Sequence, residues 1–350
     1  MSFSVGIVGL PNVGKSTLFK ALTKQPIDIS NYPFCTIDPN VGIVEVPDER
    51  LSQINDLIPH DKVTPAAIEF VDIAGLVKEA HKGEGLGNQF LANVREVKVI
   101  CHVVRNFEDD NITHVEGKPD PQRDAEIINT ELIMKDLDTV ENRLEKVQKE
   151  ARSGAKPALA ELESLNQIKE ILNQGHILSQ QPEKEKERFA ETSQIFNSLL
   201  TCKPMIYVLN TQQDDLEKEL PLKPALAMDL KLEMEMAELS EDELKELNLG
   251  PSGLNDLIKE CYEILDLITF LTAGGGKEAR AWPLKKGSTA PQAGSVIHTD
   301  FEEKFIKADV INWQKLIEAG SWAKAREKGV LQTVGKDYIV VDGDVIEFKI

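Results

Sequence analysis

The sequence has 350 residues, of which 41% are hydrophobic and 28% charged, so it is long enough for two or three domains with cores of their own. Its formal net charge of −19 excludes a protein that coats nucleic acid through its overall electric field, and an RNA partner would have to meet a local basic patch. The four cysteines lie far apart and form no C-x-x-C pair, which favours reduced thiols over disulfides or a metal cluster.

The first ten residues lack the charged and apolar segments of a secretory signal. No run in the sequence approaches the roughly 18 apolar residues of a membrane span. We therefore expect a cytoplasmic protein without a membrane partner, and we expect it to be a monomer.

The most informative motif is G-L-P-N-V-G-K-S-T at residues 9–17, which completes the G-x-x-x-x-G-K-[ST] pattern of a phosphate loop. An apolar strand pattern precedes it at residues 4–8, and a helical pattern follows it at residues 16–23. In this setting backbone N–H groups hold a triphosphate, Lys15 reaches its β and γ oxygens, and the Ser16 hydroxyl binds Mg²⁺. The motif predicts a nucleotide site.

The strand patterns that follow alternate with helical or glycine-rich stretches, which predicts an α/β P-loop NTPase fold with a doubly wound, mainly parallel sheet. Further strands are expected at residues 41–46, 67–73, 99–104, 204–209 and 225–228.

Between the strands expected at 99–104 and 204–209, the composition changes to a stretch rich in Glu, Lys, Leu and Gln. Its apolar residues follow the 4-3-4-3 spacing of a coiled coil at Ile133, Leu137, Val140, Leu144 and Val147. A second apolar stripe follows the break at Gly154 and Pro157, which indicates an antiparallel helical hairpin. The hairpin could be a structural arm or a partner-binding arm. We expect an NTPase domain in two parts, 1–124 and 203–267, an inserted helical coiled-coil arm at 125–202, and a small α+β domain at 268–350.

Asp72 ends a predicted buried strand, where its carboxylate would help to hold Mg²⁺, and Gly75 would let a backbone N–H meet the γ-phosphate. Thr36 lies in the expected first switch and would complete the Mg²⁺ shell when a triphosphate is present. Ras-like GTPases carry a water-orienting Gln after this glycine, whereas this chain has Leu76, which cannot form a hydrogen bond through its side chain. Another group must position the attacking water.

Three histidines are candidates to replace that Gln: His81, His102 and His114. We favour His114 as the catalytic residue because it lies in a polar loop after an expected strand. His102 lies inside an apolar strand and is better explained as a core residue.

The base-reading segment should follow the strand that ends at Leu209, and there the chain reads Asn210-Thr211-Gln212-Gln213. Guanine-specific proteins use N-K-x-D, in which the Asp accepts hydrogen bonds from two guanine donors. Gln213 at the Asp position offers one acceptor and one donor, a pattern that matches the adenine amine and ring nitrogen. The sequence disfavours GTP and mildly favours ATP.

Several long segments resemble the YchF/Obg-like ATPase family. Besides the phosphate loop they are N-Y-P-F-C-T-I-D-P-N (31–40), D-I-A-G-L-V-K-E-A-H-K-G-E-G-L-G-N-Q-F-L (72–91), G-S-T-A-P-Q-A-G (287–294) and K-D-Y-I-V-V-D-G-D-V (336–345). The resemblance covers nearly the whole chain. It implies a P-loop domain with an inserted coiled coil and a C-terminal TGS domain, ATP preference over GTP, slow K⁺-stimulated hydrolysis, and contacts of the arm and the TGS domain with ribosomal RNA and protein.

The same resemblance assigns the catalytic role to His114 with Lys15, matches Leu76 to the family's apolar replacement of Gln, and gives Asn12 to K⁺. The chain departs from the family at the base motif, where Gln213 replaces the acidic residue of N-x-x-E. The metal ligands expected are Ser16, Thr36, Asp72 and Asn12. The residues expected to bind the nucleotide are Asn12, Val13, Gly14, Lys15, Ser16, Thr17, Gly75, Asn210, Thr211, Gln213, Asp229 and Leu230.

The leading hypothesis is an ATP-hydrolysing switch, in which the γ-phosphate and Mg²⁺ order two switch segments. Two alternatives stay open, an Obg-type GTPase and a nucleotide sensor with negligible turnover.

Overall fold

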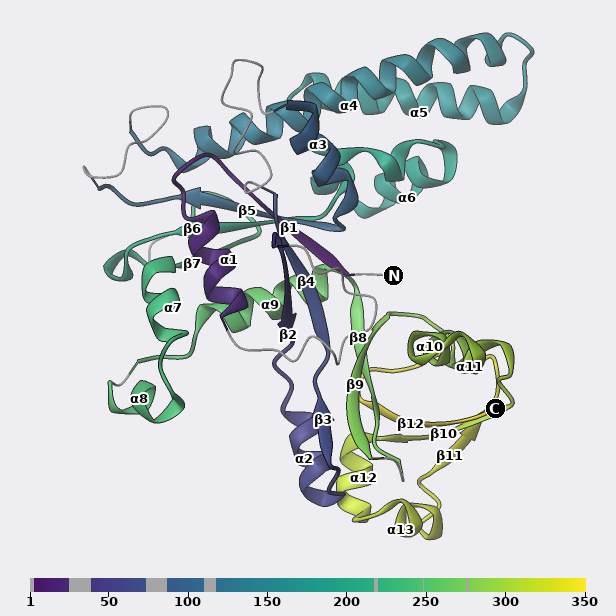
Figure 1. Cartoon of the computed structure of the whole chain (residues 1–350). Helices are drawn as coiled ribbons and strands as arrows, with labels where there is room; N and C mark the ends of the chain where they lie inside the picture. Colours follow the sequence, from purple (N-terminus) through teal and green to yellow (C-terminus); the bar gives the residue numbers. More distant parts are fainter. Residues whose placement is uncertain are drawn as a thin grey trace.

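The computed structural model describes residues 3–24, 39–73, 87–109, 118–216, 220–247, 249–274 and 277–350 (Figure 1). Within these residues the chain forms two six-stranded sheets, helices that pack on them, and a helical arm that projects from the body. The expected α/β fold is confirmed. Among the described helices, none is both long enough and apolar enough to cross a membrane.

The first sheet has the strand order β2-β4-β1-β5-β6-β7. All neighbouring strands in it are parallel except β2 and β4, as the doubly wound pattern predicts. Strands β1 and β5 are buried along their whole length, which explains their near-continuous apolar runs. The bounds are β1 (Ser4–Val8), β2 (Val41–Glu45), β4 (Ala67–Asp72), β5 (Val99–Arg105), β6 (Met205–Asn210) and β7 (Ala225–Met228).

Helices and short 3₁₀ turns connect these strands. Ser252 accepts a hydrogen bond from the backbone N–H of Leu254 and caps α9. The helices of this part are α1 (Lys15–Thr23), α2 (Glu49–Leu57), α3 (Gly87–Glu96), α7 (Leu230–Met236), α8 (Glu241–Glu246) and α9 (Gly253–Ile264). The 3₁₀ turns are η3 (Leu178–Gln180), η4 (Phe196–Ser198), η5 (Leu200–Cys202) and η6 (Gln213–Asp215).

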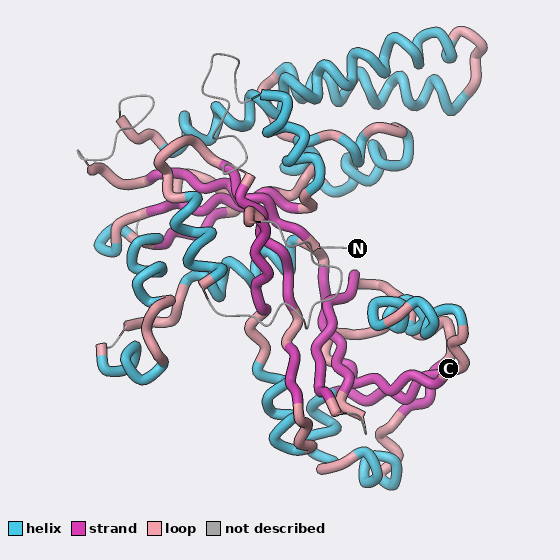
Figure 2. The backbone as a smooth tube through the Cα atoms, in the orientation of Figure 1, coloured by secondary structure: helices cyan, strands magenta, loops and turns pink. Residues whose placement is uncertain are grey.

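The arm consists of α4 (Pro121–Ala151) and α5 (Lys156–Asn173), with α6 (Glu183–Thr192) packed beside α5. Figure 2 shows these helices projecting away from both sheets. With 31 residues, α4 is about 46 Å long. The expected coiled-coil positions face the partner helix: Ile133, Val140, Leu144 and Val147 are buried, and Leu137 is partly buried. The sequence did not reveal α6, whose only fully buried residue is Phe189.

The second sheet has the strand order β11-β10-β12-β8-β9-β3 and its own apolar core around Phe270. Five of its strands come from the C-terminal part: β8 (Leu267–Thr272), β9 (Glu278–Lys285), β10 (Lys307–Asn312), β11 (Gln332–Val334) and β12 (Asp344–Lys349). Its helices are α10 (Ala290–Ile297), α11 (Thr299–Glu303), α12 (Trp313–Ala319) and α13 (Trp322–Glu327). The sixth strand, β3 (Lys62–Thr64), comes from the first part of the chain and pairs in parallel with β9. The sequence did not reveal this pairing. The four expected domain ranges and the TGS assignment stay predictions.

Candidate functional site

The phosphate loop leaves β1 through a backbone that requires glycine at two positions. Gly9 has φ 147° and Gly14 has φ 108°, both in the region that residues with a side chain avoid. A Cβ atom on Gly9 would lie 2.3 Å from the carbonyl oxygen of Val103, and one on Gly14 would lie 2.7 Å from Nδ2 of Asn210. The glycines of the motif therefore allow the loop to pack closely against β5 and β6.

Lys15 begins α1 and points its ammonium group into the loop. The residue is only 8% exposed, and its Nζ donates a hydrogen bond to the carbonyl oxygen of Leu10 at 2.5 Å. Burial lowers the pKa of Lys15 to about 8, although the negative charge of Asp72 opposes this shift. The charged form of a buried ammonium group with a lowered pKa is stabilised by a nearby anion. A phosphate ligand would provide such an anion. Ser16, the next residue, is exposed.

Asp72 ends β4 in register with Ile7 of β1, so it lies beside the strand that leads into the phosphate loop. The residue is 6% exposed, and its backbone N–H donates to the carbonyl oxygen of Asn40 at 2.8 Å. The oxygen atoms of Asp72 and Ser16 are the hard ligands that Mg²⁺ prefers. The described residues contain no cluster of three or more His, Cys, Asp or Glu suited to a metal.

Asn210 ties three segments together at the end of β6. Its Nδ2 donates to the carbonyl oxygen of Val13 at 3.0 Å, and its Oδ1 accepts from the backbone N–H of Leu230 at 3.3 Å. The side chain thus joins the phosphate loop to the start of α7, and Leu230 itself is fully buried. In this arrangement Asn210 shapes the loop through its amide.

The other residues expected near the base differ in what their side chains do. Thr211 is 1% exposed and its hydroxyl bonds to Leu209 and Asn106, so it holds the strand end. Asp229 caps α7 by accepting from two backbone N–H groups of that helix. Gln213, the first residue of η6, is exposed. Of these three, Gln213 is the most exposed, Asp229 is partly buried and Thr211 is buried.

His102 is a buried residue of β5, as the sequence suggests. Burial, and then the positive charge of Lys15, lower the pKa of His102 to about 3, so its ring is neutral near pH 7. The ring packs against Tyr207 with 5.3 Å between centroids. A histidine of such low pKa cannot carry a proton to the reaction at neutral pH, which supports its reading as a core residue.

Two residues at the end of β5 were not singled out from the sequence. Arg105 is 1% exposed, and its guanidinium donates to the carbonyl oxygens of Phe107 at 3.0 Å and Asp109 at 3.1 Å. The backbone N–H of Asn106 donates to the carbonyl oxygen of Asn210 at 2.9 Å. Together they fix the chain just before the segment that carries His114. The available signal was an arginine that closes an otherwise apolar strand.

Other expected site residues lie outside the described residues, so their roles stay predictions. They are Thr36, Gly75 and His114, together with Leu76 and His81.

Comparison with known proteins supplies the family. Residues 4–143 match the family model described as a 50S ribosome-binding GTPase, and residues 267–350 match the YchF-GTPase C-terminal model, described as a protein of unknown function. The chain is 47% identical to the Ribosome-binding ATPase YchF of Bacillus subtilis, over 100% of this chain and 99% of the relative. The chain belongs to the YchF family.

A second relative, the Ribosome-binding ATPase YchF of Escherichia coli O157:H7, is also 47% identical over 99% of each chain. The solved structure of the Schizosaccharomyces pombe YchF GTPase matches with a TM-score of 0.87 at 35% identity, covering 99% of this chain and 98% of that one. The resemblance expected from the sequence is confirmed. The likeness to this solved structure covers 99% of the chain, so it includes the arm and the C-terminal sheet as well as the phosphate loop.

Proposed function

We propose that the chain binds and hydrolyses ATP with Mg²⁺ and acts as a nucleotide-dependent switch in the cytoplasm that associates with the ribosome. The observation that carries the nucleotide site is the buried ammonium group of Lys15, set beside Asp72 at the start of α1. Relatives at 47% identity are named ribosome-binding ATPases, which supports the same activity here.

The phosphates would be bound by backbone N–H groups of residues 12–17 and by Lys15. Ser16, Asp72 and Thr36 would hold Mg²⁺, which neutralises charge on the β and γ phosphates when it is bound. Gly75 would meet the γ-phosphate through its backbone. His114 would position or deprotonate the attacking water, because Leu76 cannot. Asn12 would hold K⁺, whose charge would stabilise the transition state.

ATP is favoured over GTP because the exposed Gln213 replaces the acid that accepts two guanine donors. GTP is kept as the second candidate, since the matched family model and the fission yeast structure carry the name GTPase. A protein that senses the nucleotide without hydrolysing it is the third candidate function.

A ribosomal partner would be met by the far end of the arm. Four basic residues lie in residues 146–156 against one acidic residue, whereas the whole chain has a net charge of −19. The basic residues Lys146, Lys149, Arg152 and Lys156 are all exposed. Such a local patch is what an acidic protein needs to approach RNA phosphates. We expect the protein to act as a monomer, with the TGS domain as a second contact.

The decisive experiment titrates the purified protein with ATP and with GTP, each with Mg²⁺, and then measures turnover with and without K⁺. The proposal expects tighter ATP binding, K⁺-stimulated turnover, and loss of that stimulation in Asn12→Ala. Lys15→Ala should lose nucleotide binding but stay folded, with Lys20→Ala, an exposed lysine of the same helix, as the matched control. Preference for GTP would favour the second candidate, and binding without turnover would favour the third.

A further inference from the structure

Strands β2 and β4 pair at the edge of the first sheet, and we call this pair the β2–β4 ribbon. Strand β4 also pairs with β1, which leads into the phosphate loop. At the end of the ribbon next to that loop, the backbone N–H of Asp72 donates to the carbonyl oxygen of Asn40 at 2.8 Å. At the other end, the backbone N–H of Val46 donates to the carbonyl oxygen of Ala66 at 2.7 Å. The six residues of β4 span about 20 Å at roughly 3.3 Å per residue. The ribbon therefore connects the expected Mg²⁺ ligand directly with a distant part of the molecule.

That distant part is the C-terminal domain, which β3 and α2 contact. Lys62, Val63 and Thr64 pair in register with Glu278, Ala279 and Arg280 of β9. The Thr64 hydroxyl also donates to the Glu278 carboxylate at 2.5 Å. Helix α2 packs against α12, as the lower part of Figure 1 shows. Within the chain between β2 and β4, β3 is thus a strand of the second sheet, and α2 packs against α12 and β9.

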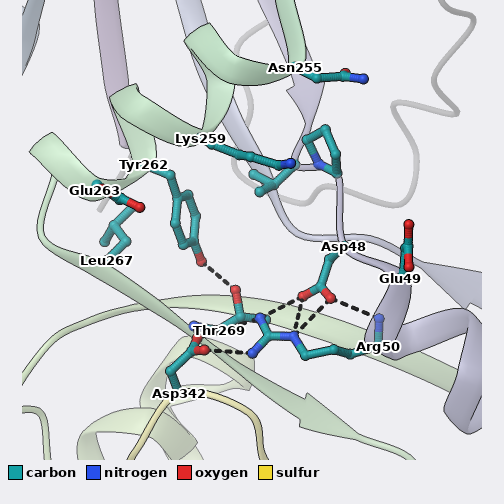
Figure 3. A pocket seen from close by; sticks show the side chains of 12 residues that line it. Asp48, Glu49, Arg50, Asn255, Lys259, Tyr262, Glu263, Leu267, Thr269 and Asp342 are labelled. Carbon is teal, nitrogen blue, oxygen red and sulfur yellow. Dashed lines mark hydrogen bonds and ion pairs between the residues drawn. The ribbon is translucent and has the colours of Figure 1, made fainter. Parts of the chain in front are cut away.

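Arg50, in the first turn of α2, closes this junction (Figure 3). Its Nε lies 2.8 Å from Oδ1 of Asp48, and its Nη1 lies 2.6 Å from Oδ2 of Asp342, which precedes β12. Asp342 Oδ1 in turn accepts from the backbone N–H of Thr269 at 2.8 Å. Burial opposes the charge of Arg50, but the hydrogen bonds and charges of Asp48 and Asp342 outweigh it and raise the pKa of Arg50 above its ordinary value.

The junction is not packed solid. A cleft of about 640 Å³ lies beside Arg50, bordered by α9, β8 and the segment that joins β2 to α2. Figure 3 shows Lys259 and Tyr262 of α9 on one side of it, with Arg50 and its carboxylates on the other. The ion pair borders this open space, whereas Leu51 and Ile54 of α2 and Leu316 of α12 belong to one continuous apolar core. A shift of α2 would therefore be transmitted to α12 through close packing, and the ion pair adds a charged contact beside it.

We propose that the β2–β4 ribbon couples the phosphate site to the C-terminal domain. In this proposal the Asp48–Arg50–Asp342 cluster is the ionic contact that holds α2 to the C-terminal domain. A triphosphate at Lys15 and Asp72 would favour one placement of the ribbon, and α2 and β3 would carry that preference into the C-terminal sheet. Coupling of this kind is reciprocal, so a change at the cluster must also change triphosphate affinity. The inference rests on a triphosphate binding at the proposed site, but not on which base it carries.

The test uses the full chain and three proteins: the parent, Asp342→Asn and Asp300→Asn. Asp342→Asn keeps an oxygen for the N–H of Thr269 and removes the charge that faces Arg50. Asp300→Asn is the matched control, because Asp300 of α11 pairs with Lys304, the residue that follows this helix, and its side chain is 46% exposed, close to the 50% of Asp342. Hydrogen exchange is measured with and without ATP and GTP, each with Mg²⁺, and the dissociation constants are measured in parallel.

We expect the triphosphate to change exchange in β3 and β9 of the parent and of Asp300→Asn. In Asp342→Asn that change should fall by about half or more, and the dissociation constant should shift about threefold or more. A parent in which the triphosphate alters exchange in β2 and β4 but not in β9 would overturn the coupling and leave the nucleotide site intact. So would an Asp342→Asn variant that behaves as the control does. Failure of both nucleotides to bind would overturn the proposed function together with this inference.

Discussion

At the scale of single residues, Lys15 makes nucleotide binding depend on pH. Its pKa in the free protein is about 8, lowered from 10.5 by burial, so the folded chain loses this proton before the unfolded chain does. A bound triphosphate favours the charged form and would raise this pKa again. Binding therefore takes up a proton above about pH 8, and affinity must fall as pH rises.

We expect the affinity for Mg²⁺-ATP to fall on the order of tenfold between pH 8 and pH 9.5, measured by calorimetric titration. Lys20→Ala, which changes an exposed lysine of α1, should show the same fall. An affinity that does not change over this range would mean that Lys15 does not meet the phosphates.

Gln213 is the residue through which base selectivity is tested. Gln213→Glu restores the acid of the family motif on an exposed side chain, so the fold should tolerate it. We expect the ratio of ATP to GTP affinity to change by about fivefold or more, because one hydrogen-bonding pattern at the base is worth about 1 to 3 kcal/mol. Gln212→Glu, a change at the exposed neighbour, is the control. Equal ratios in all three proteins would exclude Gln213 from the base site.

His114 carries the mechanistic prediction. His114→Ala should lower kcat by roughly 10- to 1,000-fold, which spans partial to full loss of general-base help, with nucleotide affinity nearly unchanged. Single-turnover hydrolysis at saturating ATP, Mg²⁺ and K⁺ measures it, and His176→Ala, at an exposed histidine after α5, is the control. Hydrolysis by the variant at the rate of the parent would exclude His114 as the catalytic residue, and His81 would be the next candidate.

These residues also show where sequence reasoning ends. The glycine pattern was enough to place Lys15 at the start of a helix, because the loop can follow only one path between β1 and α1. The motif could not show that the amide of Asn210 is engaged by Val13 and Leu230, because that depends on where β6 and β7 lie beside the loop. Nor could it show that Thr211 is buried.

At the scale of elements, the arm should bind RNA through its far end. Lys146→Glu with Lys156→Glu reverses two exposed charges there, whereas Lys184→Glu with Lys223→Glu reverses two exposed charges elsewhere. We expect the first pair to weaken ribosome binding on the order of tenfold and to reduce the salt slope by about 1.5 to 2, as lost phosphate contacts do. Sedimentation with ribosomes over a range of salt concentrations measures both. Equal weakening by the two pairs would indicate a general charge effect and no contact at the arm.

The arm itself was predictable because its contacts repeat along two neighbouring helices, and each repeat strengthens the pattern. Strand β3 was not, since its three residues carry no pattern and its partner β9 begins at Glu278, 216 residues after Lys62. For the same reason Arg50 gave no signal. Its second carboxylate, on Asp342, is 292 residues away in the chain.

At the scale of the whole molecule, the strand patterns predicted the doubly wound sheet and the spacing of apolar residues predicted the helical arm. The family resemblance added the expectation that the small C-terminal domain is a TGS domain. Composition predicted several cores, and the C-terminal sheet indeed has one of its own around Phe270. What remained hidden was how the parts are joined. The periodicity of apolar residues shows which face of a segment is buried. It does not show which distant segment pairs with a given strand.

The pairing of β3 with β9 has a consequence for the synthesis and folding of the protein. Lys62–Thr64 leave the ribosome long before β9 exists, so they must wait unpaired while about 200 further residues are synthesised at roughly 5 to 20 per second. The C-terminal sheet therefore cannot be completed until its own strands have been synthesised and β3 lies beside β9.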